Sequence, residues 1–268
     1  MGESESGQIS ARAAKIYEEF YLPGLFAEWT PRIIAAAQIE RGQRVVDVAC
    51  GTGVLARAVA DRVGATGFTV GVDINEAMLN IAREKAPEIE WHQAPAEALP
   101  LNDNSFDSAV CQFGLMYFED QQAALVEMMR VLQPGGNLAV VVWDKLENCP
   151  GYALEDRLFQ QVLGDEFADE VPYSLGDLQV LRQLFAGADI SGVQIQTYAG
   201  TARFASIEDW IYTDVNGWTI DDDVDVEDYE LLLLEAKQQL ARFVTPEGTV
   251  AFATPAHIVT ASKPNVAV

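Results

Sequence analysis

Basic residues are scarce in this chain. Lys and Arg number 17 against 41 Asp and Glu, which gives a formal net charge of −24 over 268 residues. Such a surface repels a phosphate backbone at long range, so no nucleic acid or anionic membrane is expected as a partner. We interpret the acidity as a solubility or high-salt adaptation spread over the surface rather than as a site for one cationic partner.

Cysteine and histidine are also few. The three cysteines, Cys50, Cys111 and Cys149, are odd in number and lack C-x-x-C spacing, and the two histidines, His92 and His257, stand far apart. A disulfide framework or a metal site is therefore not expected, and free thiols fit a reducing cytoplasm.

Long apolar runs are absent as well. No stretch of 18 apolar residues could span a bilayer, so membrane insertion is not expected. Residues 1–9 lack the basic and apolar regions of a secretion signal, and we interpret them as a disordered leader. A hydrophobic content of 49% allows one large core, or a core with a small cap, in a cytoplasmic globular protein.

The most informative segment that is present covers residues 45–56. It combines a buried-strand run, a carboxylate and a glycine turn before a helix. Gly51, Gly53 and Ala56 satisfy the spacing G-x-G-x-x-G/A, and Asp73 follows about twenty residues later, where an acid that binds ribose is expected. The pattern predicts a nucleotide-like cofactor, but alone it does not separate a nicotinamide enzyme from a methyltransferase.

Asp47 favours the second class. It stands four positions before Gly51, at the end of the predicted strand, with its side chain directed toward the glycine loop. A diphosphate at about 5–6 Å would be repelled by roughly 3 kcal/mol at an effective dielectric constant of about 20. The position therefore suits a ligand with positive charge, and S-adenosylmethionine (SAM) carries a sulfonium and an ammonium group.

Two later motifs agree with this choice. Residues 96–107 follow the third predicted strand, and residues 130–142 contain Pro134-Gly135-Gly136 between a helix and a strand. With these ordered motifs, roughly residues 10–145 resemble class I SAM-dependent methyltransferases. More narrowly, the chain is similar to the small-molecule group that includes the ubiquinone/menaquinone-biosynthesis C-methyltransferases, with a type 11 methyltransferase domain.

The resemblance implies a SAM site at the carboxyl ends of parallel strands, with S-adenosylhomocysteine (SAH) as product. Asp47 would receive the methionine ammonium, and Asp73 would hold the ribose hydroxyls. Gly51 and Gly53 would let the backbone approach the methionine portion. The other expected contacts are Ala49 and Thr52 in the loop, Ile74 and Met78 on adenine, Ala96 and Glu97 at the adenine edge, and Gln112 and Phe113 facing the sulfonium.

The expected fold is α/β, a Rossmann-like, doubly wound and mostly parallel seven-stranded sheet. Residues 10–40 should form N-terminal helices separated at Pro23-Gly24, residues 41–145 the SAM-binding core, and residues 146–268 the rest of the sheet. A helical substrate cap at about 205–248 would be inserted before the last strand. Strands are expected at 43–48, 67–73, 89–92, 106–112, 136–143, 192–204 and 249–261. The core and later helices are expected at 54–62, 76–86, 119–130, 151–163, 174–187, 206–215 and 228–244, with Ser174 and Ser206 as N-terminal caps.

Methyl transfer is an in-line displacement, in which alignment and exclusion of water matter more than a protein nucleophile. A small-molecule acceptor that must lose a proton needs a base, and Tyr17, Tyr117, Asp144 and His257 are unranked candidates, although a buried structural role is favoured for His257. Two other functions stay open, an NAD-dependent oxidoreductase and a catalytically silent SAM-binding protein. The sequence does not determine the acceptor or the oligomeric state.

Overall fold

The computed structural model describes residues 10–168, 170–217 and 224–265. The predicted leader, residues 1–9, lies outside these ranges, as do residues 218–223 within the predicted cap. None of the helices within the described ranges is long and apolar enough to cross a membrane.

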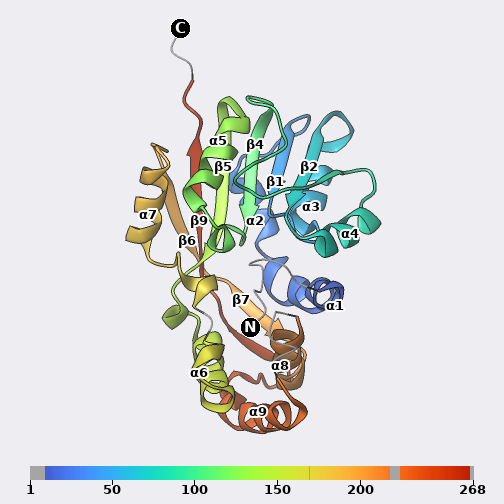
Figure 1. Cartoon of the computed structure of the whole chain (residues 1–268), viewed down its shortest axis with the longest axis vertical. Helices are drawn as coiled ribbons and strands as arrows, with labels where there is room; N and C mark the ends of the chain where they lie inside the picture. The colour runs from blue at the N-terminus through green and yellow to red at the C-terminus, as the bar shows by residue number, and fades with distance from the viewer. Residues whose placement is uncertain (1–9, 169, 218–223, 266–268) are drawn as a thin grey trace.

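One lobe of the molecule is a seven-stranded sheet (Figure 1). Its strands are β1 (Arg44–Val48), β2 (Phe68–Asp73), β3 (Glu90–Gln93), β4 (Phe106–Gln112), β5 (Leu132–Trp143), β6 (Gln194–Tyr198) and β9 (Ala256–Ser262). The order is β3-β2-β1-β4-β5-β9-β6, in which β1 to β5 are parallel and β9 is antiparallel to both of its neighbours. This confirms the predicted fold class.

The central strands are buried because helices cover both faces of the sheet. Val45, Val46 and Val48 of β1 are fully buried, as expected for a parallel strand covered on both sides. α2 (Thr30–Ala36) and α3 (Val54–Val63) pack together on one face, and α5 (Gln121–Val131) and α7 (Leu178–Gly187) pack together on the other (Figure 1). α4 (Glu76–Lys85) covers the end of the sheet at β2 and β3.

The N-terminal helices do not separate at Pro23-Gly24, so this prediction was wrong. α1 (Ala11–Ile16) continues into a π-helical segment, η1 (Tyr17–Phe26), which runs through Pro23. The wider turn is seen in the Ala27 N–H, which donates to Leu22 O at 2.8 Å. A proline lacks a backbone donor, and a local π turn accommodates that gap without ending the helix. The helix ends at Phe26, and α2 begins at Thr30, with Pro31 in its first turn.

The last two predicted strands are each broken in two. The strand expected at 192–204 divides into β6 and β7 (Thr201–Phe204), and the strand expected at 249–261 divides into β8 (Val250–Ala253) and β9. β7 and β8 form a separate two-stranded sheet. The two interruptions lie side by side, as shown by the hydrogen bond from the Thr254 N–H to Gly200 O at 3.0 Å. Pro255 has no backbone N–H, so the strand hydrogen bonds cannot continue through it.

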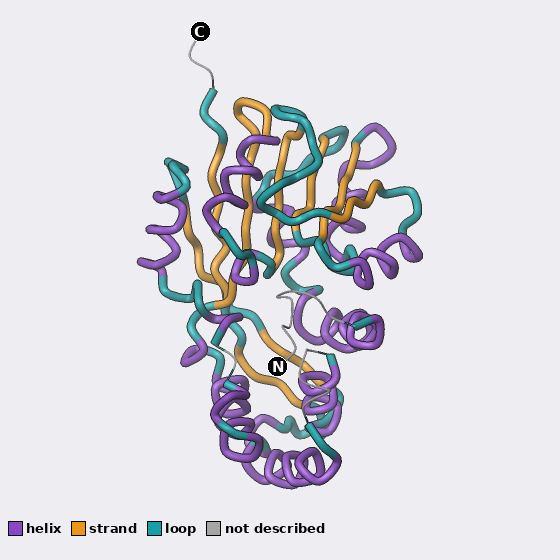
Figure 2. Tube along the Cα trace, viewed as in Figure 1, coloured by secondary structure: helices purple, strands orange, loops and turns teal. Residues whose placement is uncertain are grey.

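A second lobe lies beyond the carboxyl ends of the parallel strands (Figures 1 and 2). It contains the β7–β8 sheet, α6 (Pro150–Leu163), α8 (Ile207–Asn216) and α9 (Val226–Gln239). α8 and α9 are inserted between β7 and β8, within the segment predicted as the cap, but α6 also belongs to this lobe and packs against α9. Trp210 anchors the lobe, stacking on Phe204 with ring centroids 5.6 Å apart.

The helix caps were predicted with one error. Ser206 Oγ accepts the Asp209 N–H at 3.0 Å and caps α8 as expected. Asp177, not Ser174, caps α7, because its Oδ1 accepts the N–H groups of Gln179 and Val180. The Ser174 hydroxyl instead donates to Val171 O, within a short turn that precedes the helix. Further 3-10 turns lie at 64–66, 115–117, 146–148, 165–167, 171–173 and 241–243.

Candidate functional site

The loop between β1 and α3 has a left-handed backbone. Ala49, Gly51 and Gly53 have φ angles of 57°, 55° and 86°. A Cβ on Gly53 would lie 2.4 Å from Trp91 Cη2, so the missing side chain makes room for the indole beneath the loop. A Cβ on Gly51 would have only Tyr17 Cε1 near it, at 3.9 Å. The space beside Gly51 is therefore open on the side to which a Cβ would point.

Asp73 holds this loop in place from the end of β2. Its Oδ2 accepts the Gly51 N–H at 2.7 Å, and its Oδ1 accepts the Asn75 N–H at 2.8 Å. Burial raises the pKa of the Asp73 carboxyl, although these backbone hydrogen bonds oppose the shift. The carboxylate thus lies beside the glycine loop, where the ribose-binding acid is expected.

Asp47 is the carboxylate near the loop that has the fewest hydrogen bonds. Its side chain is 1% exposed, and neither carboxylate oxygen has a hydrogen-bond partner of regular geometry in the described chain. Burial raises its pKa well above the usual range, opposed in part by the nearby backbone of Ala56. A buried carboxylate without a partner is costly. A ligand cation such as the SAM ammonium would offset that cost, whereas a diphosphate would increase it.

The remaining residues expected to contact SAM lie in different environments. Ile74 is 43% exposed, and Met78 and Ala96 are buried. Glu97 Oε1 accepts the Asp120 N–H at 3.2 Å, at the start of α5. Gln112 connects β4 to the N-terminal helices, because its Oε1 accepts the Thr30 hydroxyl and its Nε2 donates to Phe26 O, both at 3.3 Å.

Three of the four candidate bases lie away from the cavity described below. Tyr17 lies beside the glycine loop, and burial, with Asp73 next in effect, raises the pKa of its phenol well above the usual range. His257 is 2% exposed and uses both ring nitrogens. Nδ1 lies 2.9 Å from Thr197 Oγ1, and Nε2 donates to Gly176 O at 3.0 Å and lies 3.2 Å from Asp144 Oδ1. His257 and Asp144 therefore have the structural role that the sequence favoured for the histidine.

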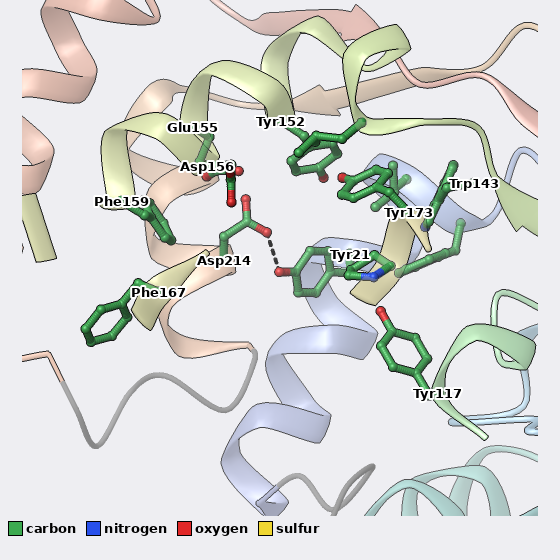
Figure 3. Close-up of a pocket in the computed structure, with 14 residues that line it drawn as sticks. Tyr21, Tyr117, Trp143, Tyr152, Glu155, Asp156, Phe159, Phe167, Tyr173 and Asp214 are labelled. Atoms are coloured by element: carbon green, nitrogen blue, oxygen red, sulfur yellow. Dashed lines mark hydrogen bonds between the residues drawn. The ribbon is translucent and has the colours of Figure 1, made fainter. Parts of the chain in front are cut away.

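A cavity of about 130 Å³ lies between the two lobes, and Tyr117 is the candidate base that lines it (Figure 3). The cavity is aromatic on most sides and acidic at one end. Its lining residues are Tyr21, Leu25, Phe26, Tyr117, Trp143, Leu146, Tyr152, Glu155, Asp156, Phe159, Phe167, Pro172, Tyr173 and Asp214.

From the sequence, Tyr117 is a candidate base, and Tyr21 and Trp143 are aromatic residues that could line an acceptor pocket, but the contribution of α6 is missed. Tyr152, Glu155 and Phe159 recur at spacings of three and four on one face of that helix. A glutamate on a face shared with two aromatic residues was the available signal, because such a face is normally apolar.

An aromatic wall connects the cavity to the glycine loop. The rings of Trp143 and Phe113 stack with centroids 3.7 Å apart and planes 14° apart. Phe26 lies 6.0 Å from Trp143 and 5.1 Å from Tyr17, centroid to centroid. Phe113, expected at the sulfonium, therefore packs directly on a side chain that lines the cavity.

This strand order and this glycine loop with its two carboxylates define a class I SAM-dependent methyltransferase. The model of the ubiE/COQ5 methyltransferase family matches residues 23–174. The chain belongs to this family. The membership decides against the NAD-dependent oxidoreductase alternative.

Curated relatives agree with this membership. A demethylmenaquinone methyltransferase of Staphylococcus carnosus is 31% identical over 188 residues, which cover 64% of this chain and 78% of that protein. The ubiquinone/menaquinone biosynthesis C-methyltransferase UbiE of Escherichia coli is 44% identical over 128 residues, covering 46% of this chain and 51% of that protein. This chain thus spans only about half the length of some of the relatives that it matches.

Solved structures share the fold. The YcgJ protein from Bacillus subtilis superposes with a TM-score of 0.62 at 21% identity, over 89% of this chain and 99% of that one. A SAM-dependent methyltransferase from Aquifex aeolicus gives a TM-score of 0.53 at 20% identity, over 70% and 90%.

Proposed function

We propose that this methyltransferase binds SAM along the glycine loop and methylates a ring-containing small molecule held in the aromatic cavity. The observation that carries the proposal is the stack of Trp143 on Phe113. Phe113 is expected to face the methyl donor, and Trp143 lines the cavity. The two compartments share this wall, so a ring in the cavity lies next to the expected position of the methyl group.

Bound SAM supplies an electrophilic methyl group on a positively charged sulfur. Asp47 would bind the ammonium, Asp73 the ribose hydroxyls, and the backbone at Gly51 and Gly53 the methionine portion. Ala49 and Thr52 would complete the loop contacts, and Thr52 Oγ1 is buried without a partner in the described chain. Ile74, Met78, Ala96 and Glu97 would surround adenine, and Gln112 and Phe113 would border the sulfonium.

The cavity walls would align the acceptor and exclude water from the reaction. Flat aromatic walls suit a flat acceptor, because offset stacking and burial both favour it. Tyr117 lines the cavity and remains the candidate for holding or moving an acceptor proton. Since Asp214 of α8 and four residues of α6 line the cavity, we propose that the second lobe acts as the substrate cap.

We further propose that the protein works in the cytoplasm with no nucleic-acid partner. The three cysteines are free and buried. The net charge of −24 opposes association with a phosphate backbone.

Isothermal titration of SAM and SAH into protein stripped of ligand tests the cofactor site. We expect micromolar affinity for both, and no binding by folded protein would contradict the proposal. A turnover screen of phenols, quinols, amines and carboxylates then separates an active enzyme from the catalytically silent SAM-binding alternative. SAM affinity without turnover on any compound would favour the latter.

A further inference from the structure

The far end of the cavity carries a group of carboxyls. Glu155 and Asp156 come from α6 and Asp214 from α8. Figure 3 shows Asp214 between the α6 carboxyls and Tyr21, whose hydroxyl donates to Asp214 Oδ1. The group lies on elements far apart in the sequence, and it faces a cavity rather than solvent or the core.

Glu155 is the member of this group that lacks a full set of partners. Its side chain is 5% exposed, and its Oε1 has no hydrogen-bond partner within the described residues. Burial, with Asp214 close by, raises the pKa of Glu155 well above its usual range. Asp214 and Trp210 interact with this carboxyl, but folding leaves its Oε1 buried at the cavity without a hydrogen-bond partner, which is unfavourable unless a ligand supplies one.

Aromatic rings surround the carboxyls. Tyr21, Tyr152, Phe159 and Tyr173 line the same cavity, and the Tyr152 hydroxyl is buried without a partner among the described residues. The faces of aromatic rings attract cations, most of all where water is excluded. Because carboxyl groups and ring faces both attract positive charge, a cavity that contains both suits an organic cation.

We propose that the acidic end of the cavity binds a protonated amine of the methyl acceptor through Glu155 and Asp214, with the rest of the acceptor directed toward Trp143. This rests on the proposed function, since it assumes that the cavity holds the acceptor. A carboxylate or phosphate would be repelled there, and a neutral carbonyl could accept a hydrogen bond only from a protonated Glu155, without the charge-assisted bonds that an ammonium would make to both carboxyls. A bare metal ion would require oxygen ligands on several sides, whereas most of this cavity wall is apolar ring.

Matched pairs of probes test the inference on SAH-saturated protein by isothermal titration. Tyramine and 4-ethylphenol share a phenol ring and differ in the ammonium, as do benzylamine and benzyl alcohol in a smaller pair. We expect each amine to bind at least about tenfold more tightly than its neutral partner, because a buried charge-assisted hydrogen bond distinguishes them. Equal affinities within both pairs, or binding of neither pair, would overturn the inference.

Glu155→Gln provides the residue-level test. The preference for the amines should fall by about tenfold or more, while affinity for the neutral probes stays the same or rises. Glu84→Gln is the matched control, because it removes an exposed carboxylate on α4 and makes the same change in formal net charge, one unit less negative. A preference that survives in Glu155→Gln overturns the assignment, and Asp214→Asn gives the same test if the first variant does not fold.

The number of protons released when the amine binds is a further measurement, and a purely structural role of Glu155 would not affect it. If the ammonium binds to a carboxyl that is protonated in the empty cavity, binding should release up to about one proton. The observed enthalpy should then depend on the ionisation heat of the buffer in the wild type, and less so in Glu155→Gln. SAH binding, measured first in each variant, separates the outcomes. Loss of SAH binding would contradict the proposed function, whereas intact SAH binding without amine preference would contradict only this inference.

Discussion

The indole of Trp143 lies flat against the ring of Phe113, with centroids 3.7 Å apart. Trp143 is the last residue of β5, and Phe113 directly follows β4, where its N–H donates to Val141 O at 3.0 Å. Phe113 has a φ angle of 56°, in the left-handed region that β-carbon sterics disfavour. Adjacent parallel strands thus end in two stacked rings, which separate the expected cofactor site from the cavity.

Trp143→Ala should lower the free energy of unfolding by about 3–5 kcal/mol, because it removes a buried aromatic side chain and leaves a cavity. Trp143→Phe should cost less, since it keeps a ring against Phe113. Urea unfolding measures both variants. A loss below about 1 kcal/mol for the alanine variant would show that the stack does not support this part of the fold.

Asp47→Asn should have opposite effects on SAM binding and on the stability of the empty protein. SAM should bind about 10- to 100-fold more weakly, because the ammonium loses a charged partner. The ligand-free protein should be more stable by about 1–3 kcal/mol at neutral pH, because a buried carboxyl without a partner is replaced by a neutral amide.

Titration calorimetry and thermal unfolding measure the two effects of Asp47→Asn. Asp61→Asn is the control, since Asp61 is exposed on α3 and its loss changes the net charge by the same amount. SAM affinity equal to that of the wild type would remove Asp47 from the cofactor site.

Gly53→Ala should destabilise the protein by about 2–5 kcal/mol, combining left-handed strain with overpacking. The added Cβ would lie 2.4 Å from Trp91 Cη2. Gly248→Ala is the matched control, because Gly248 has a φ angle of 87°, close to the 86° of Gly53, but no atom within 4 Å of the added Cβ. It should therefore show the strain alone, about 1–2 kcal/mol. Chemical denaturation of the two variants should reveal this difference, and equal losses would mean that Trp91 moves aside freely.

The pH dependence of stability should reflect Glu155. Its pKa is higher in the folded protein than in the unfolded chain, chiefly because of burial. As pH rises above the unfolded value, the unfolded chain loses this proton while the folded protein keeps it, so stability falls by up to about 1.4 kcal/mol per pH unit. Below the unfolded value this contribution disappears.

Glu155→Gln should therefore stabilise the empty protein at pH 7 to 8, with a gain that shrinks as the pH approaches 4. Thermal unfolding across this range, compared with Glu84→Gln, measures the effect. A gain that does not change with pH would mean that Glu155 titrates normally in the folded protein.

The family and the core of the fold were determined by the sequence itself. Val45 to Val48, the glycine loop and Asp73 lie within one β-α-β unit, where strand burial, the turn and the helix start depend on neighbouring residues. Asp47 could be singled out for the same reason, because a strand-end carboxylate before a glycine loop has its direction set by the strand.

Other features were decided only by tertiary structure. The breaks at Gly200 and Pro255 depend on two distant strands bending together, and η1 passes through Pro23 because surrounding packing overrides the usual effect of proline. His257 is occupied by partners from three separate segments.

The cavity depends on tertiary structure most of all. Its acidic end joins Tyr21, Glu155 and Asp214, which lie far apart in the sequence. On its own helix, Glu155 shares a face with Tyr152 and Phe159, which marks it as unusual but does not show what surrounds it. The packing of α6 within the second lobe buries Glu155, and Asp214 of α8 supplies the neighbouring charge. Burial and neighbouring charge are properties of the assembled structure, so the helix sequence alone does not give them.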